Sequence, residues 1–505
     1  MPGSSVKRNL IANLVGSGWC ALLSIATIPF YIHFMGIESY ALIGINISLM
    51  TISAIMDMGM STTINREIAR LTSLPDKVQE AINLVRTFEV LNWIIAVFIG
   101  LLIISLAHFI AYYWVKPGTL KVGTVQQAII LMGISMVFQW PFSFYSAGFI
   151  GLQKQVLLNV ITAGMATLRS AGVLLVLWLV SPTIQAFLVW QIAVNALQFF
   201  LLATLLKKTL PETGKRAVFQ LGLIRSIWRF ATGIGGVSIM GMFWSQIDKL
   251  ILSKLLSLET FGYYTLASVV ATSFSRLMGP LVTAIFPRFN QLIVLGDIEK
   301  LKQLYHSGCQ MMSVLIMPFT FLLVFFSREI LQLWSQDPVT AEKTSVLVVF
   351  LAIGTMFNGL VHIPLILEYA YGKTRMVFYT MATTIIIMVP AILLATRHFG
   401  VIGATVVLMT INVVYALSVP YLIHNRFLTE EKGDWYFRDV GIPLIAALTV
   451  MWTGRMLVNA DMSALRLVSS LIVITILTIC STAYSTSAVR SWFLGHMGKL
   501  SAKII

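Results

Sequence analysis

The sequence predicts an all-α polytopic membrane protein with about 14 transmembrane helices, in two pseudo-symmetric six-helix lobes plus a C-terminal helix pair. Three observations lead to this fold class: the composition, the succession of apolar runs and an internal repeat. Of the 505 residues, 58% are hydrophobic and 11% are charged, and the mean hydropathy is +0.87. Soluble domains carry about 25% charged residues, and disordered chains are poor in apolar residues. Both of those classes are therefore excluded.

Apolar runs long enough to cross a bilayer follow one another along the whole chain. A spanning helix needs about 20 mostly apolar residues. The first run lacks a small-residue cleavage site after a short apolar core, so we expect a retained helix and not a removable signal peptide. The predicted spans are 9–34, 40–68, 86–110, 125–150, 157–180, 184–206, 229–256, 261–288, 308–326, 344–371, 376–396, 401–424, 439–457 and 465–486.

An internal repeat divides these spans into two halves. Ile37–Leu42 aligns with Leu258–Tyr263 at an offset of about 221 residues, which covers six helices and therefore gives two halves of the same orientation. The predicted organisation is an N-terminal lobe at 1–206, a basic cytoplasmic linker at 207–228, a C-terminal lobe at 229–430, the last two spans at 431–486, and a cytoplasmic amphipathic tail at 487–505.

The distribution of basic residues predicts the orientation. With the N-terminus inside, the cytoplasmic segments hold 24 of the 35 Lys and Arg residues and the outer loops hold 9. This asymmetry follows the positive-inside rule. We therefore expect both termini on the cytoplasmic side of a bacterial inner membrane. The net charge of +15 needs no nucleic-acid partner to explain it.

The remaining two basic residues, Arg169 and Arg276, lie inside predicted spans. A mid-membrane arginine costs at least about 2.5–3.5 kcal/mol, so it normally faces a wet cavity or a partner. One interpretation is an anion-binding cavity, and the other is a structural salt bridge, for example with Asp57. A polar stripe accompanies Arg276 at helical spacing, comprising Thr265, Ser268, Thr272, Gly279 and Thr283. Another stripe, in the first span, includes Asn13.

Two further titratable residues in predicted spans are candidates for ion coupling. Asp57 lies in the second span on a face with Asn46, Ser53 and Ser61. Its role as a counter-ion for an arginine is at least as well supported as a proton-coupling role. His362 is a candidate because histidine ordinarily titrates near neutral pH, although a lone histidine on a helix is more often simply hydrogen-bonded. The coupling ion would be H⁺ or Na⁺.

Sequence signals of an enzyme or of a bound cofactor are missing. The chain contains no G-x-S-x-G, H-E-x-x-H or Walker A sequence. Cys20, Cys309 and Cys480 lie in apolar runs, which is typical of buried thiols and not of a metal site or disulfide framework. We therefore expect no metal, no cofactor and no enzymatic activity.

Several motifs between Asn9 and Arg70 point to a known family. They are an Asn-rich first span, Pro29, Met35-Gly36-Ile37-Glu38-Ser39-Tyr40, and Asp57-Met58-Gly59-Met60 leading to Asn65-Arg66-Glu67. With Leu331-Gln332-Leu333-Trp334 and Gly372-Lys373, they resemble the lipopolysaccharide O-antigen (repeat-unit) flippases of the multidrug/oligosaccharidyl-lipid/polysaccharide exporter superfamily. Ser335 follows Trp334 where a Leu-Gly-like continuation is expected, which is a departure from the family pattern.

The resemblance implies transfer of an undecaprenyl-pyrophosphate-linked oligosaccharide from the cytoplasmic to the periplasmic leaflet by alternating access, with ion coupling. It also implies membrane lipids, and polymerase and chain-length proteins of the same pathway, as partners. Arg169, Arg276, Thr272, Ser268 and Asn13 are then the predicted substrate-binding residues. The alternatives are a cation-coupled multidrug exporter, which an acidic cavity would favour, and a membrane polymerase or ligase, which would need larger outer loops.

Overall fold

The computed structural model describes residues 2–57, 59–211, 215–458, 462–487 and 490, and excludes the side chains of 2–8, 10, 11, 14 and 223–239. Every regular element in the described part of the chain is a helix, which confirms the predicted all-α class. The predicted amphipathic tail lies outside the described residues except for Ser487 and Arg490.

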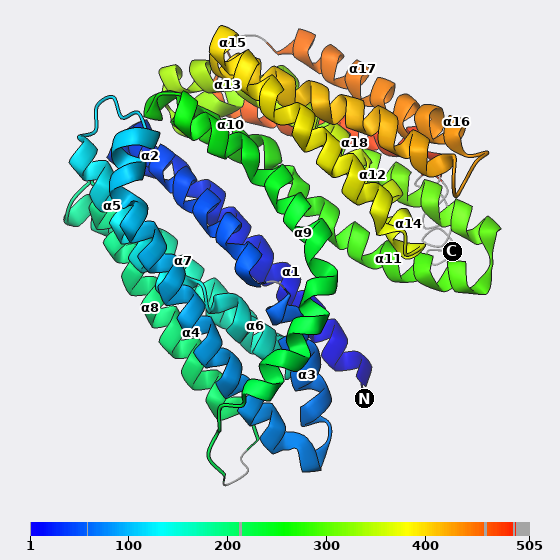
Figure 1. The fold of residues 1–505 in the computed structure, drawn as a ribbon. Helices are drawn as coiled ribbons and strands as arrows, with labels where there is room; N and C mark the ends of the chain where they lie inside the picture. The colour runs from blue at the N-terminus through cyan, green and yellow to red at the C-terminus, as the bar shows by residue number, and fades with distance from the viewer. Residues whose placement is uncertain (1, 58, 212–214, 459–461, 488–489, 491–505) are drawn as a thin grey trace, which may run out of the picture. The chain divides into compact units, whose positions relative to one another are not determined.

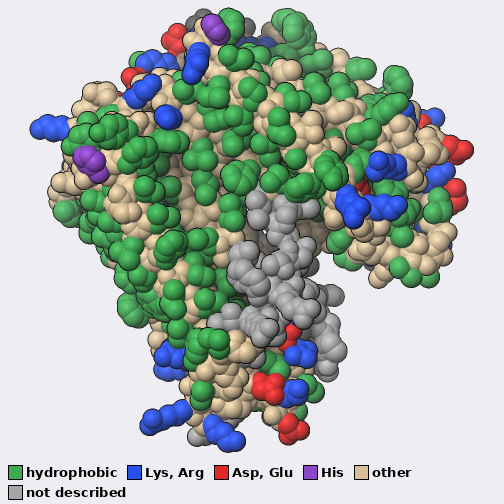
Figure 2. Space-filling model, viewed as in Figure 1, with side chains coloured by type: hydrophobic (Ala, Val, Ile, Leu, Met, Phe, Trp, Pro, Cys, Tyr) green, Lys and Arg blue, Asp and Glu red, His purple; other side chains and the backbone are tan. Residues whose placement is uncertain are grey.

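Eleven helical segments in the described residues are long and apolar enough to cross a membrane. The number is below the predicted fourteen because the runs 376–396 and 401–424 form one element that turns at Gly400. In addition, the runs 9–34 and 229–256 lie partly in segments whose side chains are not described. Hydrophobic side chains are spread over much of the visible surface, whereas Lys, Arg, Asp and Glu gather toward its margins (Figure 2). The protein is therefore a multi-pass membrane protein.

The chain forms two compact units, Met1–Gly262 and Tyr263–Ile505. The first contains long helices joined by short turns, and Figure 1 shows their order along the chain. Its elements are α1 (Pro2–Ala26), α2 (Ile28–Ser53), η1 (Ala54–Asp57), α3 (Met60–Thr72), η2 (Pro75–Lys77), α4 (Val78–Phe109), η3 (Ile110–Trp114), α5 (Val122–Gln139), α6 (Phe142–Gly151), α7 (Gln155–Leu179), α8 (Ile184–Thr209), α9 (Leu221–Leu255) and the start of α10 (Leu258–Thr272).

Apolar side chains at one end of the first unit hold α3, α4, α6, α7 and α8 together. Phe88, Phe144 and Phe149 are almost fully buried in this cluster. Beside it, the buried Glu89 carboxylate accepts hydrogen bonds from Tyr145 Oη at 2.9 Å and Arg86 Nη1 at 3.0 Å, and pairs with Lys207 Nζ at 2.9 Å. Burying a charged carboxylate is costly unless it is paired in this way. The cluster therefore fixes α4, α6 and α8 relative to one another.

The second unit is built around α12, which contacts α11, α13, α14, α17, α18 and η5. The buried side chains of α12 include Phe and Met together with small polar residues such as Ser and Thr. The elements are the end of α10, η4 (Ser273–Leu277), α11 (Met278–Leu295), α12 (Ile298–Ser335), α13 (Pro338–Leu360), α14 (His362–Ala370), α15 (Thr374–His424), α16 (Lys432–Asp434), η5 (Trp435–Gly441), α17 (Ile442–Leu457) and α18 (Ala464–Ser485).

Helix boundaries recur at the offset of the sequence repeat. The second span breaks into a 3₁₀ turn at 54–57, and the corresponding span of the second half breaks at 273–277. The turn at 140–141 between α5 and α6 has its counterpart at 361, between α13 and α14. Because a break needs its own local backbone conformation, matched breaks support a duplicated six-helix pattern more strongly than scattered identities do.

These breaks interrupt one polar helix face that the sequence predicted. The sequence places Ser268, Thr272 and Arg276 on a single face of a continuous helix, but α10 ends at Thr272 and a 3₁₀ segment follows. A 3₁₀ turn has about 3.0 residues per turn in place of 3.6, so the helical periodicity stops there. The continuous stripe was therefore a wrong prediction beyond Thr272.

Candidate functional site

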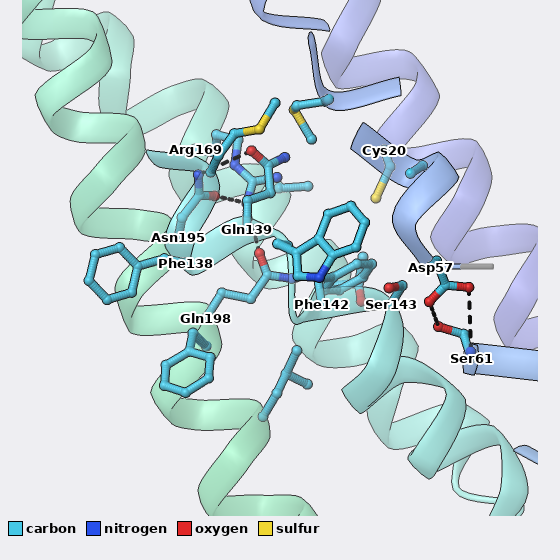
Figure 3. A pocket seen from close by; sticks show the side chains of 18 of the residues that line it. Cys20, Asp57, Ser61, Phe138, Gln139, Phe142, Ser143, Arg169, Asn195 and Gln198 are labelled. Atoms are coloured by element: carbon cyan, nitrogen blue, oxygen red, sulfur yellow. Dashed lines mark hydrogen bonds between the residues drawn. The ribbon is translucent and has the colours of Figure 1, made fainter. Parts of the chain in front are cut away.

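A cavity of about 570 Å³ lies within the first unit. Side chains from α1, α2, η1, α3, α5, α6, α7 and α8 line it, and Figure 3 shows several of them from close by. The charged residues in its wall are Arg169 and Asp57. The cavity thus contains one of the two predicted arginines and the predicted acidic residue, contributed by segments far apart in the sequence.

Arg169 lies in α7 and is held by two amide oxygens of α8. Its Nη2 donates to Asn195 Oδ1 at 2.8 Å and to Gln198 Oε1 at 2.7 Å. Asn195 and Gln198 are 4% and 6% exposed, and Asn195 in turn donates to Ser135 Oγ at 2.9 Å. They are one helical turn apart, so both face α7. The guanidinium is consequently fixed in direction by neutral groups.

The positive charge of Arg169 is not neutralised by a carboxylate of the described residues. Its hydrogen-bond partners are the two amides, and its buried Nε has no partner in the described part of the chain. A buried donor without a partner costs about 1–3 kcal/mol, and arginine keeps its charge in proteins. The salt bridge with Asp57 that the sequence allowed does not form. An anion entering the cavity would satisfy both the charge and the free donor.

Asp57 faces the same cavity from the broken second span. Its Oδ1 accepts from Ser61 Oγ at 2.7 Å, and its Oδ2 accepts from the Ser61 backbone N at 3.4 Å (Figure 3). Asp57 therefore sits at the N-terminus of α3, where the helix dipole favours a negative charge. Gly59, with φ of 78°, makes the turn between them, a conformation that favours glycine.

The rest of the cavity wall is aromatic and amide-bearing. Phe138, Trp140, Phe142 and Phe199 provide ring faces, and Gln139 and several hydroxyls provide polar groups. Trp140 Nε1 is buried without a hydrogen-bond partner among the described residues. Aromatic faces beside amides and hydroxyls suit a ligand that is apolar on its ring faces and polar at its edges.

The other predicted substrate residues lie elsewhere. Asn13 in α1 bonds to Gln155 and Asn159 of α7 and joins these two helices outside the cavity wall. Ser268, Thr272 and the exposed Arg276 belong to α10 and η4 at the start of the second unit. The Thr272 hydroxyl donates to the Ser268 backbone oxygen at 2.7 Å, an intrahelical bond.

His362 begins α14 in the second unit. Its Nδ1 lies 3.0 Å from the Asn358 backbone oxygen, and Asn358 donates to Asn412 Oδ1 at 3.0 Å. This arrangement matches the hydrogen-bonded alternative that the sequence left open. A group of three or more His, Cys, Asp or Glu residues able to hold a metal ion is absent from the described residues.

The sequence prediction missed Asn195, Gln198 and the aromatic wall. Two amides at i and i+3 in an otherwise apolar span were a usable signal, because such residues should face one direction away from lipid. Trp140 followed by Pro141 also marked a break in a span. Neither signal identifies its partner helix, so their association with Arg169 required the tertiary structure.

Two solved structures share this fold. The chain aligns with a lipid II flippase MurJ in an inward closed conformation, with a TM-score of 0.64 and 12% identity, over 94% of this chain and 98% of that one. It aligns with an inward-facing multidrug resistance MATE family transporter of the MOP superfamily, with a TM-score of 0.66 and 12% identity, over 82% and 96%. At such identities the similarity establishes the fold.

Sequence comparisons agree with the predicted resemblance. The chain is 20% identical over 402 residues to a Shigella flexneri protein described as "Putative O-antigen transporter", covering 80% of this chain and 94% of that protein. A family model described as polysaccharide biosynthesis protein matches residues 6–293, which is more than half of the chain. The resemblance inferred from the motifs is confirmed, and the chain belongs to the polysaccharide biosynthesis protein family.

Proposed function

We propose that this protein is a flippase that moves an undecaprenyl-pyrophosphate-linked oligosaccharide from the cytoplasmic to the periplasmic leaflet by alternating access. The observation that carries the proposal is the Arg169 guanidinium. It lies in a membrane-spanning helix, two amide oxygens of the next helix hold it, and its buried Nε has no hydrogen-bond partner among the described residues. Pyrophosphate oxygens accept bidentate hydrogen bonds from guanidinium groups. The family membership supports the carbohydrate part of the substrate.

The cavity wall supports the same ligand class. Sugar rings present apolar faces and hydroxyl edges, which match the Phe and Trp faces and the amides Gln139 and Asn195. A volume of about 570 Å³ suits the pyrophosphate and adjoining sugar better than a whole repeat unit. In this proposal the prenyl tail stays in the lipid while the polar head crosses.

The membrane setting of the proposal is the bacterial inner membrane, with both termini in the cytoplasm. The excess of Lys and Arg in the alternate loops supports this orientation. Asp57, on the cavity wall, and His362 are the proposed ion-coupling residues, with H⁺ or Na⁺ as the ion. Ser268, Thr272 and Arg276, in the second unit, are further proposed substrate-binding residues. Polymerase and chain-length proteins of the same pathway are the proposed partners that receive the product.

A cation-coupled multidrug exporter is the second candidate, because the fold matches a MATE transporter as well as it matches a flippase. The cavity wall carries one arginine and one aspartate, so it is not the acidic cavity that a lipophilic cation would favour. The relatives described above are transporters and flippases by name. The polymerase or ligase alternative therefore has no support.

The experiment compares two ligands on the purified full-length chain in lipid nanodiscs. One is a short prenyl-pyrophosphate oligosaccharide and the other is tetraphenylphosphonium. The variants are Arg169→Gln, Arg169→Lys and, as a control, Arg70→Gln, which removes an exposed arginine paired with Glu67. We expect saturable binding of the oligosaccharide, weakened about tenfold or more by Arg169→Gln, because charge-assisted hydrogen bonds are lost.

Arg169→Lys keeps the charge but loses the planar fork, so an intermediate loss is expected. The control should bind like the wild type. Stronger binding of the phosphonium ion would favour the exporter. Undiminished oligosaccharide binding by a correctly folded Arg169→Gln protein would show that the arginine serves only the structure.

A further inference from the structure

A second cluster of ionisable groups lies in the second unit, apart from the cavity. His306 of α12 places both ring nitrogens against carboxylates: Nδ1 is 2.5 Å from Asp439 Oδ2, and Nε2 is 3.1 Å from Glu431 Oε2. Asp439, in the π-helical segment η5, is fully buried. Its other oxygen accepts from Gln310 Nε2 at 2.8 Å. The His306 side chain retains 18% of its exposure, so water can reach it.

The geometry requires a proton on this cluster. A neutral imidazole has one N–H donor and one lone pair. With both nitrogens facing carboxylate oxygens, a neutral ring would turn its lone pair toward an anion. The imidazolium form donates at both positions and removes that conflict. His306 and Lys302 then carry two positive charges that balance Asp439 and Glu431.

The other ionisable groups near His306 do not hold this proton in its place. On α12, Tyr305 donates or accepts at 2.9 Å with His424 Nε2 at the end of α15, and Cys309 lies one turn away. Lys302 Nζ is bound at 2.8 Å to Glu431 Oε1. The remaining charged or titratable groups on the facing segment are Glu430, Lys432, Asp434, Tyr436 and Arg438, and Arg438 is paired with Asp434 at 3.2 Å.

We propose that His306, Asp439 and Glu431 form a proton-binding site, and that the proton held there fastens η5 and the preceding turn to α12. Loss of the proton removes the positive charge beside the buried Asp439 and leaves the neutral ring one N–H donor for two carboxylates. An uncompensated buried charge is strongly destabilising, so η5 separates from α12 when the site empties. The contact that opens lies just before α17 and α18, which also pack directly on α12.

The segment that would move is suited to local release. η5 is a π-helix, a conformation with weaker backbone support that is common where helices adjust. Its attachment to α12 also includes a hydrogen bond from Ser313 Oγ to the Asp439 backbone oxygen at 2.7 Å. All the groups of the site belong to the second unit, so the inference is independent of the proposed substrate and of the cavity.

Hydrogen exchange measured by mass spectrometry tests the proposal on the full chain in nanodiscs. The readout is the protection of backbone amides in residues 435–441 at about pH 6 and about pH 9, corrected for the intrinsic pH dependence of exchange. In the wild type, protection should fall at least about tenfold between these conditions, since one pKa unit of linkage corresponds to a tenfold change. Equal protection at both values would overturn the proposal.

Variants identify the group responsible. His306→Gln cannot titrate, so its protection should be low at both pH values without a step. Asp439→Asn leaves no buried anion when the ring loses its proton, so its step should shrink. Arg438→Gln and His424→Gln are matched controls, one beside Asp439 in sequence and one beside His306 in space, and both should keep the step. A full step in either His306→Gln or Asp439→Asn would assign the proton elsewhere, and exchange in the first unit reports whether each variant is folded.

Discussion

Arg169 shows how a charged residue can be stable in a membrane-spanning helix without an acidic partner. Its Nη2 donates to the amide oxygens of two buried side chains, which stabilise the positive charge but do not neutralise it. Hydrogen bonds to a charged group contribute about 1.5–3 kcal/mol each. The arrangement leaves the Nε without a partner in the described residues and so keeps the guanidinium ready for an anion.

The first prediction concerns Gln198, which positions Arg169. Gln198→Leu should weaken binding of the prenyl-pyrophosphate oligosaccharide about tenfold, because the guanidinium loses one of the two bonds that fix its direction. Combining this substitution with Arg169→Gln in a double-mutant cycle separates positioning from direct contact. If the two effects simply add, Gln198 does not act through Arg169.

A second prediction concerns Glu431 at acidic pH. Lys302, at 2.8 Å, holds the pKa of Glu431 below its ordinary value of 4.5, and His306 acts in the same direction. The native state then binds this proton less tightly than the unfolded chain does. The resulting stability is present above pH 4.5 and is lost as the pH falls through the lowered pKa.

The measurement for Glu431 is the unfolding midpoint in detergent between about pH 5 and about pH 3. The wild type should lose stability more steeply than Lys302→Met, in which the Glu431 pKa lies closer to its ordinary value. The other carboxylates titrate in both proteins, so the difference isolates this pair. Parallel pH curves would contradict the prediction.

Breaks and caps at the scale of single elements decide which residues reach the cavity. The 3₁₀ turn at 54–57 and the left-handed Gly59 direct Asp57 toward the cavity wall. Just after the break of α2 at Gly36, Glu38 accepts bonds from three consecutive backbone N–H groups, those of Gly118, Thr119 and Leu120, at 2.9–3.1 Å. One carboxylate thus ties the loop after η3 to α2.

The third prediction is that Glu38→Gln destabilises the protein by about 1.5–3 kcal/mol, because its amide nitrogen cannot accept from these donors. Glu38 is 5% exposed, so water cannot replace the lost acceptor. The unfolding midpoint of the purified protein in detergent measures the effect. Glu80→Gln, at an exposed glutamate in the first turn of α4, serves as the control and should leave the midpoint unchanged.

For the whole molecule, the distribution of charge predicts a single orientation in the membrane. The fourth prediction is that both termini lie in the cytoplasm, because 24 of the 35 basic residues fall in the segments on that side. A fluorescent protein fused after Ile505 should fluoresce, and an alkaline phosphatase fused there should be inactive. Fusion of phosphatase within 115–121 should be active, and the reverse pattern would show the opposite orientation.

The sequence by itself determined the fold class, most of the spans and the family. A bilayer demands about 20 apolar residues for each helix and satisfies backbone groups only within helices, so these features are written locally in the chain. The motifs near Gly36 and Asp57 were also local, and the family comparison agreed with them. Arg169 and Asp57 stood out because charges are rare within spans.

Only the tertiary structure decided which polar groups meet. Arg169 finds its amides 26 and 29 residues away on α8, and His306 finds Asp439 at a separation of 133 residues. Helical periodicity shows that a residue faces away from lipid but not which helix it faces. The 3₁₀ break that separates Arg276 from Thr272 was invisible for a related reason, since backbone breaks depend on packing as well as on local sequence. Pairing across helices is a property of long-range packing, and the sequence encodes it only through the whole fold.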